Sequence, residues 1–364
     1  MSKVLYVINH IDWFWSHRLP LAKGAQDQSH TVHVAVTGAS NDPQLTQKGF
    51  TGHETPSGNP IKTITTLHRI IKTEKPDIIH AITLKYALLT ALAARNQPGT
   101  KVIHTIAGLG YLFSGEGLKP KLLRLILLPV FKRTFKNTRT KLIFQNPDDQ
   151  ALFLKRGLAN ETQCHLIRGS GVDTTQFPHT PEPKTDTPII LMPTRLVIEK
   201  GIATFIEATK ILQSKGIKAK YQIAGGISTS NPNAITEPQM HQMLNGSPVE
   251  WLGKVTNMPA LYQSASLIVY PSYYGEGIPK VLLEAASTGR AIITTNHPGC
   301  REAVTDGENG LLVPVKDPQA LANAIETLLN DPKMRLKMGQ NSRKKAEEEF
   351  AVERIVEQTL RLYS

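Results

Sequence analysis

Short apolar runs alternate with longer amphipathic stretches along the whole chain. The runs of the first half that are expected to form strands are Val4–Ile8, Val32–Val36, Ile78–Ala81, Lys101–Thr105, Lys141–Phe144 and His165–Ile167. Those of the second half are Ile189–Met192, Tyr221–Ala224, Glu250–Leu252, Ser266–Tyr270, Ala291–Thr294 and Gly310–Val313. Because each run precedes a stretch long enough for a helix, the pattern predicts βα units and parallel sheets.

The length and a polar break near the middle indicate two domains. A chain of 364 residues exceeds the usual size of a single core. The stretch His179–Pro188, HTPEPKTDTP, is rich in Pro and Thr and separates the two series of apolar runs, so it reads as a linker. We therefore expect an α/β protein with doubly wound domains at 1–182 and 183–345, followed by a charged helical segment at 346–364.

The composition is typical of a soluble globular protein, with 40% hydrophobic and 20% charged residues. No stretch approaches the roughly 18 apolar residues of a membrane span. The opening, MSKVLYVINH, reads as a first strand rather than a signal peptide. Cys164 and Cys300 lack the spacing of a metal site and imply no disulfide framework. These features favour a cytosolic protein.

The segment Pro271–Arg290, PSYYGEGIPKVLLEAASTGR, carries the most specific chemistry in the chain. Pro279 marks the start of a helix that is almost wholly apolar, so Glu284 is a charge on a helix expected to be buried. Two glycines flank Glu276 and allow its loop to approach a ligand closely. A helix start also favours anions such as phosphate. This combination suits a nucleotide sugar, although glutamates near a helix start also occur as solvated residues.

A pair of cations follows the first expected strand of the second domain. Arg195 lies at the carboxyl end of that strand, and Lys200 comes just before the next helix. An arginine fork and a lysine point charge can hold a diphosphate and neutralise the charge that builds on it as it departs. Because the chain contains no Asp-x-Asp, we expect these cations to replace a metal, with no cofactor. The other interpretation is a surface pair beside a helix start.

Several cations and histidines lie near the expected carboxyl ends of the first-domain strands. His104 ends the strand KVIHT and precedes a glycine-bearing loop. His17 and Arg18 follow the first strand, whereas His80 and Lys85 belong to HAITLKYA. Open α/β domains bind ligands at this edge, and cations there suit an acceptor that bears phosphate. A lone histidine is more often structural, so only its position favours a role for His104 in the site.

Basic residues are concentrated in the first half of the chain. The formal net charge is +12, and nearly all of the excess precedes residue 183. The segment 118–141 holds eight basic residues and no acidic one, among many leucines. Such basic amphipathic segments bind anionic membrane surfaces, and a core helix with a solvated basic face is the alternative. No nucleic-acid-binding motif accompanies the charge, so we expect no nucleic acid partner.

A dinucleotide-binding enzyme would show the same alternation of strands and helices. Its G-x-G-x-x-G signature should follow a strand. Here the first strand leads into NHIDWFWSHRLPLA, which has no glycine, and the AGG at Ala224–Gly226 is incomplete. The sequence therefore argues against an NAD-dependent Rossmann enzyme.

Together, several motifs resemble those of a known enzyme family, the retaining GT-B glycosyltransferases of family 4 (glycosyl transferases group 1). The motifs are SHRLPLA, HAITLK, HTIAGLGYLF, FQNPDD and PSYYGEGIPKVLLEA. They are most similar to bacterial members that add N-acetylhexosamine-type sugars to lipid-linked glycans. The resemblance implies two Rossmann-like domains, the first for the acceptor and the second for the nucleotide sugar. It also implies that the segment 346–364 packs back on the first domain.

The resemblance implies roles for individual residues. Glu276 and Glu284 would contact the donor sugar and the ribose, Arg195 and Lys200 the pyrophosphate, and His104 the donor sugar near the reacting carbon. Other donor-binding positions implied by the resemblance are Gly225, Lys254, Val255, Gly277 and Ile278. The backbone at Lys254 and Val255 would read the base.

The implied reaction is retaining, metal-independent transfer of an N-acetylhexosamine or hexose from a UDP-sugar. The expected acceptor is a polyprenyl-diphosphate-linked glycan or a surface polysaccharide such as O-antigen, at the inner face of the cytoplasmic membrane. His17, Arg18, His80 and Lys85 would bind it. Two alternatives remain open. A nucleotide-sugar 2-epimerase of the same architecture would form product from UDP-sugar alone, whereas a non-catalytic binding protein would bind UDP without transfer.

Overall fold

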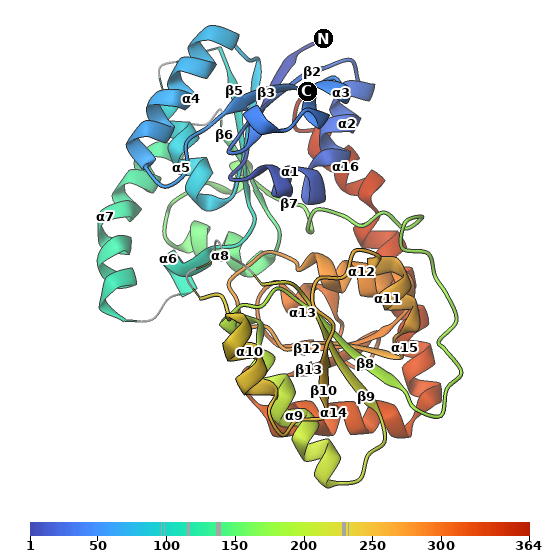
Figure 1. The fold of residues 1–364 in the computed structure, drawn as a ribbon. Helices are drawn as coiled ribbons and strands as arrows, with labels where there is room; N and C mark the ends of the chain where they lie inside the picture. Colours follow the sequence, from blue (N-terminus) through green and yellow to red (C-terminus); the bar gives the residue numbers. More distant parts are fainter. Residues whose placement is uncertain (96, 98, 115–116, 136–139, 228–230, 232) are drawn as a thin grey trace. The chain divides into compact units, whose positions relative to one another are not determined.

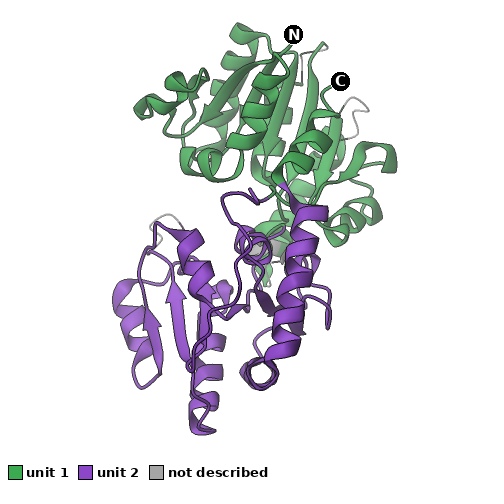
Figure 2. Ribbon diagram, turned by 90° about the vertical axis from the view of Figure 1, so that its right-hand side faces the viewer, with its two compact units in different colours: residues 1–171, 275–277, 352–364 green, residues 172–274, 278–351 purple. Residues whose placement is uncertain are grey.

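The computed structural model describes residues 1–364 except 96, 98, 115–116, 136–139, 228–230 and 232. The described residues form two compact units, drawn in green and purple in Figure 2. Unit 1 comprises Met1–Gly171, Gly275–Gly277 and Val352–Ser364, and unit 2 comprises Val172–Tyr274 and Ile278–Ala351.

Unit 1 is built on a parallel sheet with the strand order β3-β2-β1-β4-β5-β6-β7. The strands are β1 (Lys3–Val7), β2 (Thr31–Val36), β3 (Thr51–Glu54), β4 (Ile78–Ile82), β5 (Lys101–Ile106), β6 (Thr140–Phe144) and β7 (Cys164–Leu166). All of them except β3 coincide with apolar runs that the sequence predicts as strands. The sequence TGHE of β3 gives no such signal because this strand lies at the edge of the sheet, where its side chains are largely exposed.

Helices cover both faces of this sheet (Figure 1). They are α1 (Ile11–His17), α2 (Leu19–Asp27), α3 (Gln44–Gln47), α4 (Pro60–Glu74), α5 (Leu84–Ala93), α6 (Gly110–Ser114), α7 (Leu118–Phe135), α8 (Pro147–Lys155) and α16 (Val352–Leu360), with short 3₁₀ turns η1 (Ala39–Asn41) and η2 (Glu161–Gln163). On one face, α1, α2 and α16 pack with Val4 and Tyr6 of β1. On the other, α4 and α5 pack with Leu5 and Val7. Alternate side chains of β1 are thus buried on opposite faces, which explains its continuous apolar run.

Unit 2 has a second parallel sheet, in the order β10-β9-β8-β11-β12-β13. Its strands are β8 (Ile189–Pro193), β9 (Lys220–Ala224), β10 (Val249–Trp251), β11 (Leu267–Tyr270), β12 (Ala291–Thr295) and β13 (Gly310–Val313). Each coincides with a predicted run, so the expected α/β class with two parallel sheets is confirmed. The strand order reverses between β8 and β11, and doubly wound sheets bind ligands at the carboxyl ends of strands at such a point.

The helices of unit 2 also lie on both faces of its sheet. They are α9 (Ile202–Ser214), α10 (Glu237–Leu244), α11 (Met258–Ser264), α12 (Lys280–Thr288), α13 (Cys300–Ala303), α14 (Pro318–Asn330) and α15 (Pro332–Lys345), with a 3₁₀ turn η3 (Ile198–Lys200) and a π-helical turn η4 (Ala346–Phe350). Residues of α9 and α14, such as Phe205 and Leu321, bury one face. Residues of α11 and α12, such as Tyr262 and Leu283, bury the other.

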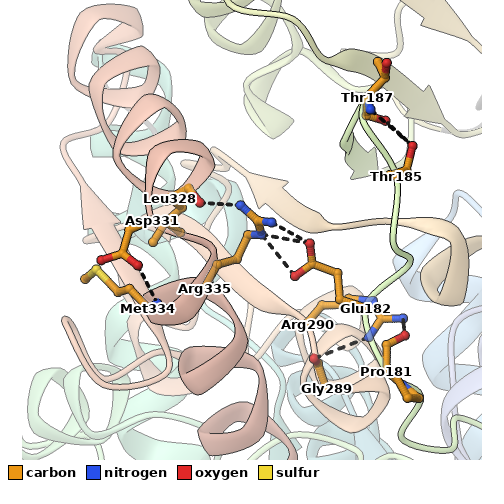
Figure 3. Close-up of polar contacts among 10 residues, drawn as sticks. All are labelled: Pro181, Glu182, Thr185, Thr187, Gly289, Arg290, Leu328, Asp331, Met334 and Arg335. Carbon is orange, nitrogen blue, oxygen red and sulfur yellow. Dashed lines mark hydrogen bonds and ion pairs between the residues drawn. The ribbon is translucent and has the colours of Figure 1, made fainter.

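The segment His179–Pro188, which the sequence suggests is a linker, lies wholly within unit 2 and is held there by two buried arginines (Figure 3). Arg290 donates to the carbonyl oxygen of Pro181 at 3.3 Å. Arg335 forms a forked ion pair with Glu182, with Nη2 at 2.6 Å from Oε1 and Nε at 3.1 Å from Oε2. The boundary expected after residue 182 therefore falls inside unit 2, because partners more than a hundred residues away fix the polar stretch.

The last segment of the chain, Val352–Ser364, is part of unit 1. Val356 of α16 packs against Gly24 of α2 so closely that a Cβ at residue 24 would overlap the valine side chain. Farther along, the hydroxyl of Tyr363 donates to the hydroxyl of Tyr6 at 3.0 Å inside the unit. The chain thus rejoins the first sheet from Val352 onward, whereas residues 346–351 stay in unit 2.

Candidate active site

Lys200 occupies the turn that follows β8 and is 2% exposed. Its Nζ donates to the hydroxyl of Tyr270 at 2.6 Å and lies 4.8 Å from the ring centroid of Tyr274. The next residue, Gly201, has a φ of +79°, and a Cβ there would overlap the carbonyl oxygen of Pro271, so the turn requires glycine. The ammonium is therefore fixed at the switch point of the second sheet. Burial limits screening by water, which strengthens its attraction for an anion.

Arg195 also follows β8 and is half-buried. Its carbonyl oxygen accepts a hydrogen bond from the backbone N–H of Val197 at 2.8 Å, which tightens the turn. Beside this turn, Gly225 at the end of β9 comes so close that a Cβ would overlap the carbonyl oxygen of Thr194. Its N–H donates to the carbonyl oxygen of Gly253 at 2.8 Å. Gly225 thus allows the ends of β8, β9 and β10 to pack closely beside Arg195.

Glu284 is 8% exposed on the buried helix α12, as the sequence predicts. Its Oε2 accepts a hydrogen bond from the hydroxyl of Tyr262 at 3.0 Å. Its Oε1 lies 3.8 Å from the Nζ of Lys280, one turn earlier on the helix. Burial raises the pKa of Glu284, and Lys280 and Tyr262 oppose that rise. A carboxylate held this way can accept hydrogen bonds from the hydroxyls of a ribose or sugar.

Three other donor-site candidates of unit 2 differ in what they offer to a ligand. Lys254 is exposed in the loop after β10, beside Gly226. Val255 and Ile278 instead direct their side chains into the apolar cluster that contains Tyr262. Ile278 is buried, so only its backbone groups are available to a ligand, whereas the side chain of Val255 is half-buried.

The loop Gly275–Gly277 belongs to unit 1, where it packs on the segment that follows β5. The N–H of Gly277 donates to the carbonyl oxygen of Ala107 at 3.1 Å, and the N–H of Gly110 donates to the carbonyl oxygen of Gly275 at 3.0 Å. Gly108 has a φ of +103°, and a Cβ there would overlap the backbone of Glu276. The close approach that Gly108 permits is to the backbone of Glu276, whereas a Cβ at Gly277 would overlap the side chain of Gln145. This packing places Glu276, which is half-buried, beside the carboxyl end of β5.

His104 lies within β5, two residues before its end, and is fully buried. Its ring packs against Phe135 of α7 at 5.3 Å between centroids. Among the described residues, neither ring nitrogen has a hydrogen-bond partner. Burial lowers the pKa of His104 to about 3. The strand is longer than the sequence suggests, so the ring lies below the sheet's carboxyl edge in an apolar layer.

The turn from β4 into α5 is strained at the same edge of the first sheet. Thr83 has a φ of +79°, which is rare for a β-branched residue. Its N–H donates to the carbonyl oxygen of Thr105 in β5 at 2.9 Å, which fixes this conformation. Lys85 follows in the first turn of α5 and is exposed. Strain of this kind collects at functional sites, and the exposed Lys85 is accessible to a ligand.

The other three acceptor candidates have different environments. His80 is fully buried, with Nδ1 at 2.6 Å from the hydroxyl of Tyr363 and Nε2 at 2.7 Å from that of Thr105. Both ring nitrogens of His80 therefore form hydrogen bonds inside unit 1. Arg18 is also buried, and burial lowers its pKa to about 10. His17 is half-buried and lies 2.7 Å from the hydroxyl of Ser16 through Nδ1.

The basic segment 118–141 forms α7 and the start of β6. Within it, residues 136–139, including Lys136 and Arg139, lie outside the described residues. Phe131 and Phe135 anchor α7 in the core of unit 1, beside α5 and α6 (Figure 1). The first half of the helix exposes large apolar side chains, namely Leu118, Leu122, Leu123, Leu125 and Ile126. In the part of the chain that is described, no helix has the length and apolar character needed to traverse a bilayer.

No sequence pattern indicates which residues hold the ammonium of Lys200 and the carboxylate of Glu284 in unit 2. Tyr270, the last residue of β11, and Tyr274 position Lys200. Tyr262 of α11 and Lys280 hold Glu284. These partners come from other elements or from another turn of the helix. The only local signal is the tyrosine-rich run YPSYY that directly precedes the loop of Glu276.

Family comparisons match both halves of the chain. Residues 3–146 match the family described as "Glycosyl transferase 4-like", and residues 173–345 match "Glycosyl transferases group 1". Among curated relatives, an N,N'-diacetylbacillosaminyl-diphospho-undecaprenol alpha-1,3-N-acetylgalactosaminyltransferase of Campylobacter jejuni is 27% identical over 89% of each chain. A UDP-Gal:alpha-D-GlcNAc-diphosphoundecaprenol alpha-1,3-galactosyltransferase of Escherichia coli is 26% identical over 83% of this chain and 79% of its own.

The fold of the chain is also similar to the folds of solved structures. A protein of Anabaena, determined in complex with UDP and glucose, superposes with a TM-score of 0.80 at 19% identity, over 100% of this chain and 99% of that one. Sucrose-phosphate synthase of Thermosynechococcus elongatus superposes with a TM-score of 0.83 at 21% identity, over 100% and 98%. With both halves matched and both sheets in place, the chain belongs to the glycosyltransferases of group 1 and has the GT-B fold.

Proposed function

We propose that this glycosyltransferase moves a hexose or N-acetylhexosamine from a UDP-sugar to a lipid-linked glycan acceptor, with retention at the sugar carbon. The observation that carries the proposal is the buried ammonium of Lys200, fixed by Tyr270 at the switch point of the second sheet. A fixed cation in a site with little water stabilises charge that develops on a departing diphosphate. Arg195, at the end of the same strand, would supply a second cation for it.

In this reaction the bond between the sugar carbon and the diphosphate oxygen breaks, and a bond forms from that carbon to an acceptor hydroxyl. The hydroxyl proton passes to the leaving diphosphate, so UDP departs with the electron pair and the proton. Lys200 and Arg195 would lower the barrier by neutralising the diphosphate, which removes the need for a metal. Glu284 would hold the ribose and Glu276 would position the sugar. His104 is fully buried in this structure, so it would reach the sugar only when the apolar layer around it opens.

A lipid-linked acceptor is favoured by two observations. Both bacterial relatives are named for acceptors that carry a diphospho-undecaprenol group. In this chain, α7 exposes Leu122, Leu125 and Ile126 next to basic residues such as Lys121. Apolar side chains flanked by lysines are the composition of a helix that lies in the surface of an anionic membrane. We therefore propose that α7 brings unit 1 to the membrane surface where the acceptor resides.

The test is a panel of UDP- and GDP-sugars incubated with the purified chain, with and without an undecaprenyl-diphosphate-linked sugar. We expect nucleoside diphosphate release that requires the acceptor and occurs with a UDP-sugar, and we expect added Mg²⁺ to leave turnover unchanged. Mass spectrometry of the lipid should show one added sugar, and the anomeric configuration should match that of the donor.

The same panel separates the other two interpretations. A nucleotide-sugar 2-epimerase would release UDP or convert the sugar without any acceptor. A non-catalytic protein would bind UDP and release nothing from any donor and acceptor. Either result would overturn the proposed transfer.

A further inference from the structure

A compact group of metal-ligating side chains lies in unit 1, apart from the residues discussed above. His33 on β2 and His53 on β3 come from neighbouring parallel strands. Nδ1 of His33 lies 2.9 Å from Nε2 of His53, whereas the ring centroids are 5.2 Å apart in nearly parallel planes. Each nitrogen therefore lies on the edge of its ring nearest the other ring, and the two nitrogens face each other directly.

A carboxylate completes this group. Glu74 is the last residue of α4, and its Oε2 lies 3.5 Å from Nδ1 of His33. The ligand atoms of His33, His53 and Glu74 all lie within 4.8 Å of one another. Among the described residues, no other three His, Cys, Asp or Glu side chains lie close enough together to hold a metal ion. His33 is buried, while His53 and Glu74 are half-buried, so the group can be reached from solvent.

We propose that His33, His53 and Glu74 bind one divalent transition-metal ion, with Zn²⁺ as the best fit, and that water fills the fourth position. Two imidazole nitrogens and one carboxylate oxygen are a common ligand set for zinc. Zn–N bonds of about 2.0–2.1 Å at a tetrahedral angle place the nitrogens about 3.4 Å apart. The histidine nitrogens must therefore separate by about half an ångström, and both rings must turn so that the nitrogens face the ion instead of each other.

The site would be structural rather than catalytic. Glu74 ends α4 near Lys3, the first residue of β1, so this ligand lies at the amino-terminal ends of the strands, whereas His53 is the third of the four residues of β3. Ligands of doubly wound sheets bind at the opposite, carboxyl edge. The edge strand β3 has only four residues and pairs with β2 alone. A metal held by β2, β3 and α4 would join this short strand to the helix that covers it.

Lys3 is the residue that opposes metal binding. Its Nζ lies 3.3 Å from Oε2 of Glu74 and donates to the carbonyl oxygen of the same residue at 2.7 Å. Because the ammonium would compete with the metal for that carboxylate, its removal should strengthen metal binding. The lysine side chain is about a third exposed and can turn toward solvent.

The experiment uses the full chain after removal of metal by a chelator and dialysis. Co²⁺ is titrated and followed by visible absorption, which distinguishes tetrahedral sites, and Zn²⁺ is then used to displace it. We expect one equivalent to bind, with a higher unfolding temperature in the presence of Zn²⁺. His53→Ala and Glu74→Gln should each weaken binding at least about tenfold, whereas Lys3→Gln should strengthen it.

The matched control is His241→Ala, which removes an exposed histidine of unit 2 that lies outside the group. It should bind Co²⁺ like the wild type. Absence of stoichiometric binding by the wild type would overturn the proposal and leave the histidines as a hydrogen-bonded pair. Equal binding by wild type, His53→Ala and Glu74→Gln would assign the metal to other residues and would also overturn it. Glu74→Gln keeps the size of a half-buried side chain, so it remains informative if His53→Ala folds poorly.

Discussion

The Nζ of Lys200 lies 2.6 Å from the phenolic oxygen of Tyr270, although the two residues are 70 positions apart in the sequence. The lysine comes from the turn after β8, and the tyrosine ends β11, so the contact spans the switch point of the second sheet. The hydroxyl accepts the lysine's hydrogen bond and limits where the ammonium can move. A cation that is already in place requires little rearrangement when charge develops on a diphosphate.

Replacing Glu284 with Gln should stabilise the free protein and impair donor binding. Burial raises the folded-state pKa of Glu284 above that of an unfolded glutamate. The stability that this shift contributes is fully present below the unfolded pKa of about 4.3 and is lost as the pH rises through the folded pKa. Urea unfolding at several pH values should therefore show a stabilising effect of Glu284→Gln at neutral pH that shrinks in acid. A destabilising effect of the same size at every pH would contradict this reasoning.

His104→Phe should lose less stability than the wild type as the pH falls below neutral. Burial lowers the folded-state pKa of His104 to about 3, against about 6.5 for an unfolded histidine. The stability contributed by the neutral ring is fully present above about pH 6.5 and is lost as the pH falls toward about 3. A phenylalanine at residue 104 would pack on Phe135 and cannot titrate, so the variant should not lose this stability in acid. Thermal unfolding from pH 7 to pH 5 tests the difference, and parallel curves for the two proteins would refute it.

The same variant separates packing from chemistry at this position. If His104 contacts the donor sugar, His104→Phe should retain the fold and lose acceptor-dependent UDP release. Unchanged release would restrict His104 to the apolar layer against α7.

Removing the guanidinium of Arg335 should destabilise unit 2. Arg335 and Glu182 form a forked pair with side chains only 6% and 11% exposed. Breaking a buried pair leaves one charge without its partner, which costs about 3 kcal/mol or more. We expect Arg335→Ala to lower the unfolding free energy by about that amount in urea titrations. Arg361→Ala, which breaks an exposed pair with Glu357, is the control and should change stability by less than about 1 kcal/mol.

The exposed leucines of α7 should control binding to anionic vesicles. Burial of one leucine side chain contributes about 1.5–3 kcal/mol, so Leu122→Glu combined with Leu125→Glu should weaken vesicle binding by at least about tenfold. Sedimentation with vesicles that contain phosphatidylglycerol measures this effect. Leu336→Glu, at an exposed leucine of α15 in unit 2, should bind like the wild type. If the wild type does not sediment with these vesicles, α7 is not a membrane-binding helix.

The sequence predicts the sheets well because their strands are buried on both faces and therefore form continuous apolar runs. It fails at β3, which is an edge strand with polar residues. It also misplaces the domain boundary. The composition of His179–Pro188 is that of a linker, and no local pattern reveals that Arg290 and Arg335 hold it in unit 2.

The charges of the site are predictable, but their environments are not. The sequence predicts that Glu284 is buried because its helix is almost wholly apolar, and the structure agrees. Tyr262 and Tyr270, which fix Glu284 and Lys200, come from other elements, so only the fold brings them together. His80 has the right sequence position for an acceptor residue, yet contacts with Thr105 and the distant Tyr363 occupy both of its nitrogens.

The most direct test of the diphosphate-binding role is acceptor-dependent UDP release by Lys200→Ala and by Lys210→Ala, measured beside the wild type. Lys210 is a partly exposed lysine on α9 that pairs with Glu207, so its removal controls for loss of one positive charge. Loss of about 1.4 kcal/mol of transition-state stabilisation lowers the rate tenfold. We predict that Lys200→Ala loses at least about tenfold in kcat, while Lys210→Ala retains wild-type kinetics. Wild-type kcat in a folded Lys200→Ala protein would contradict the account.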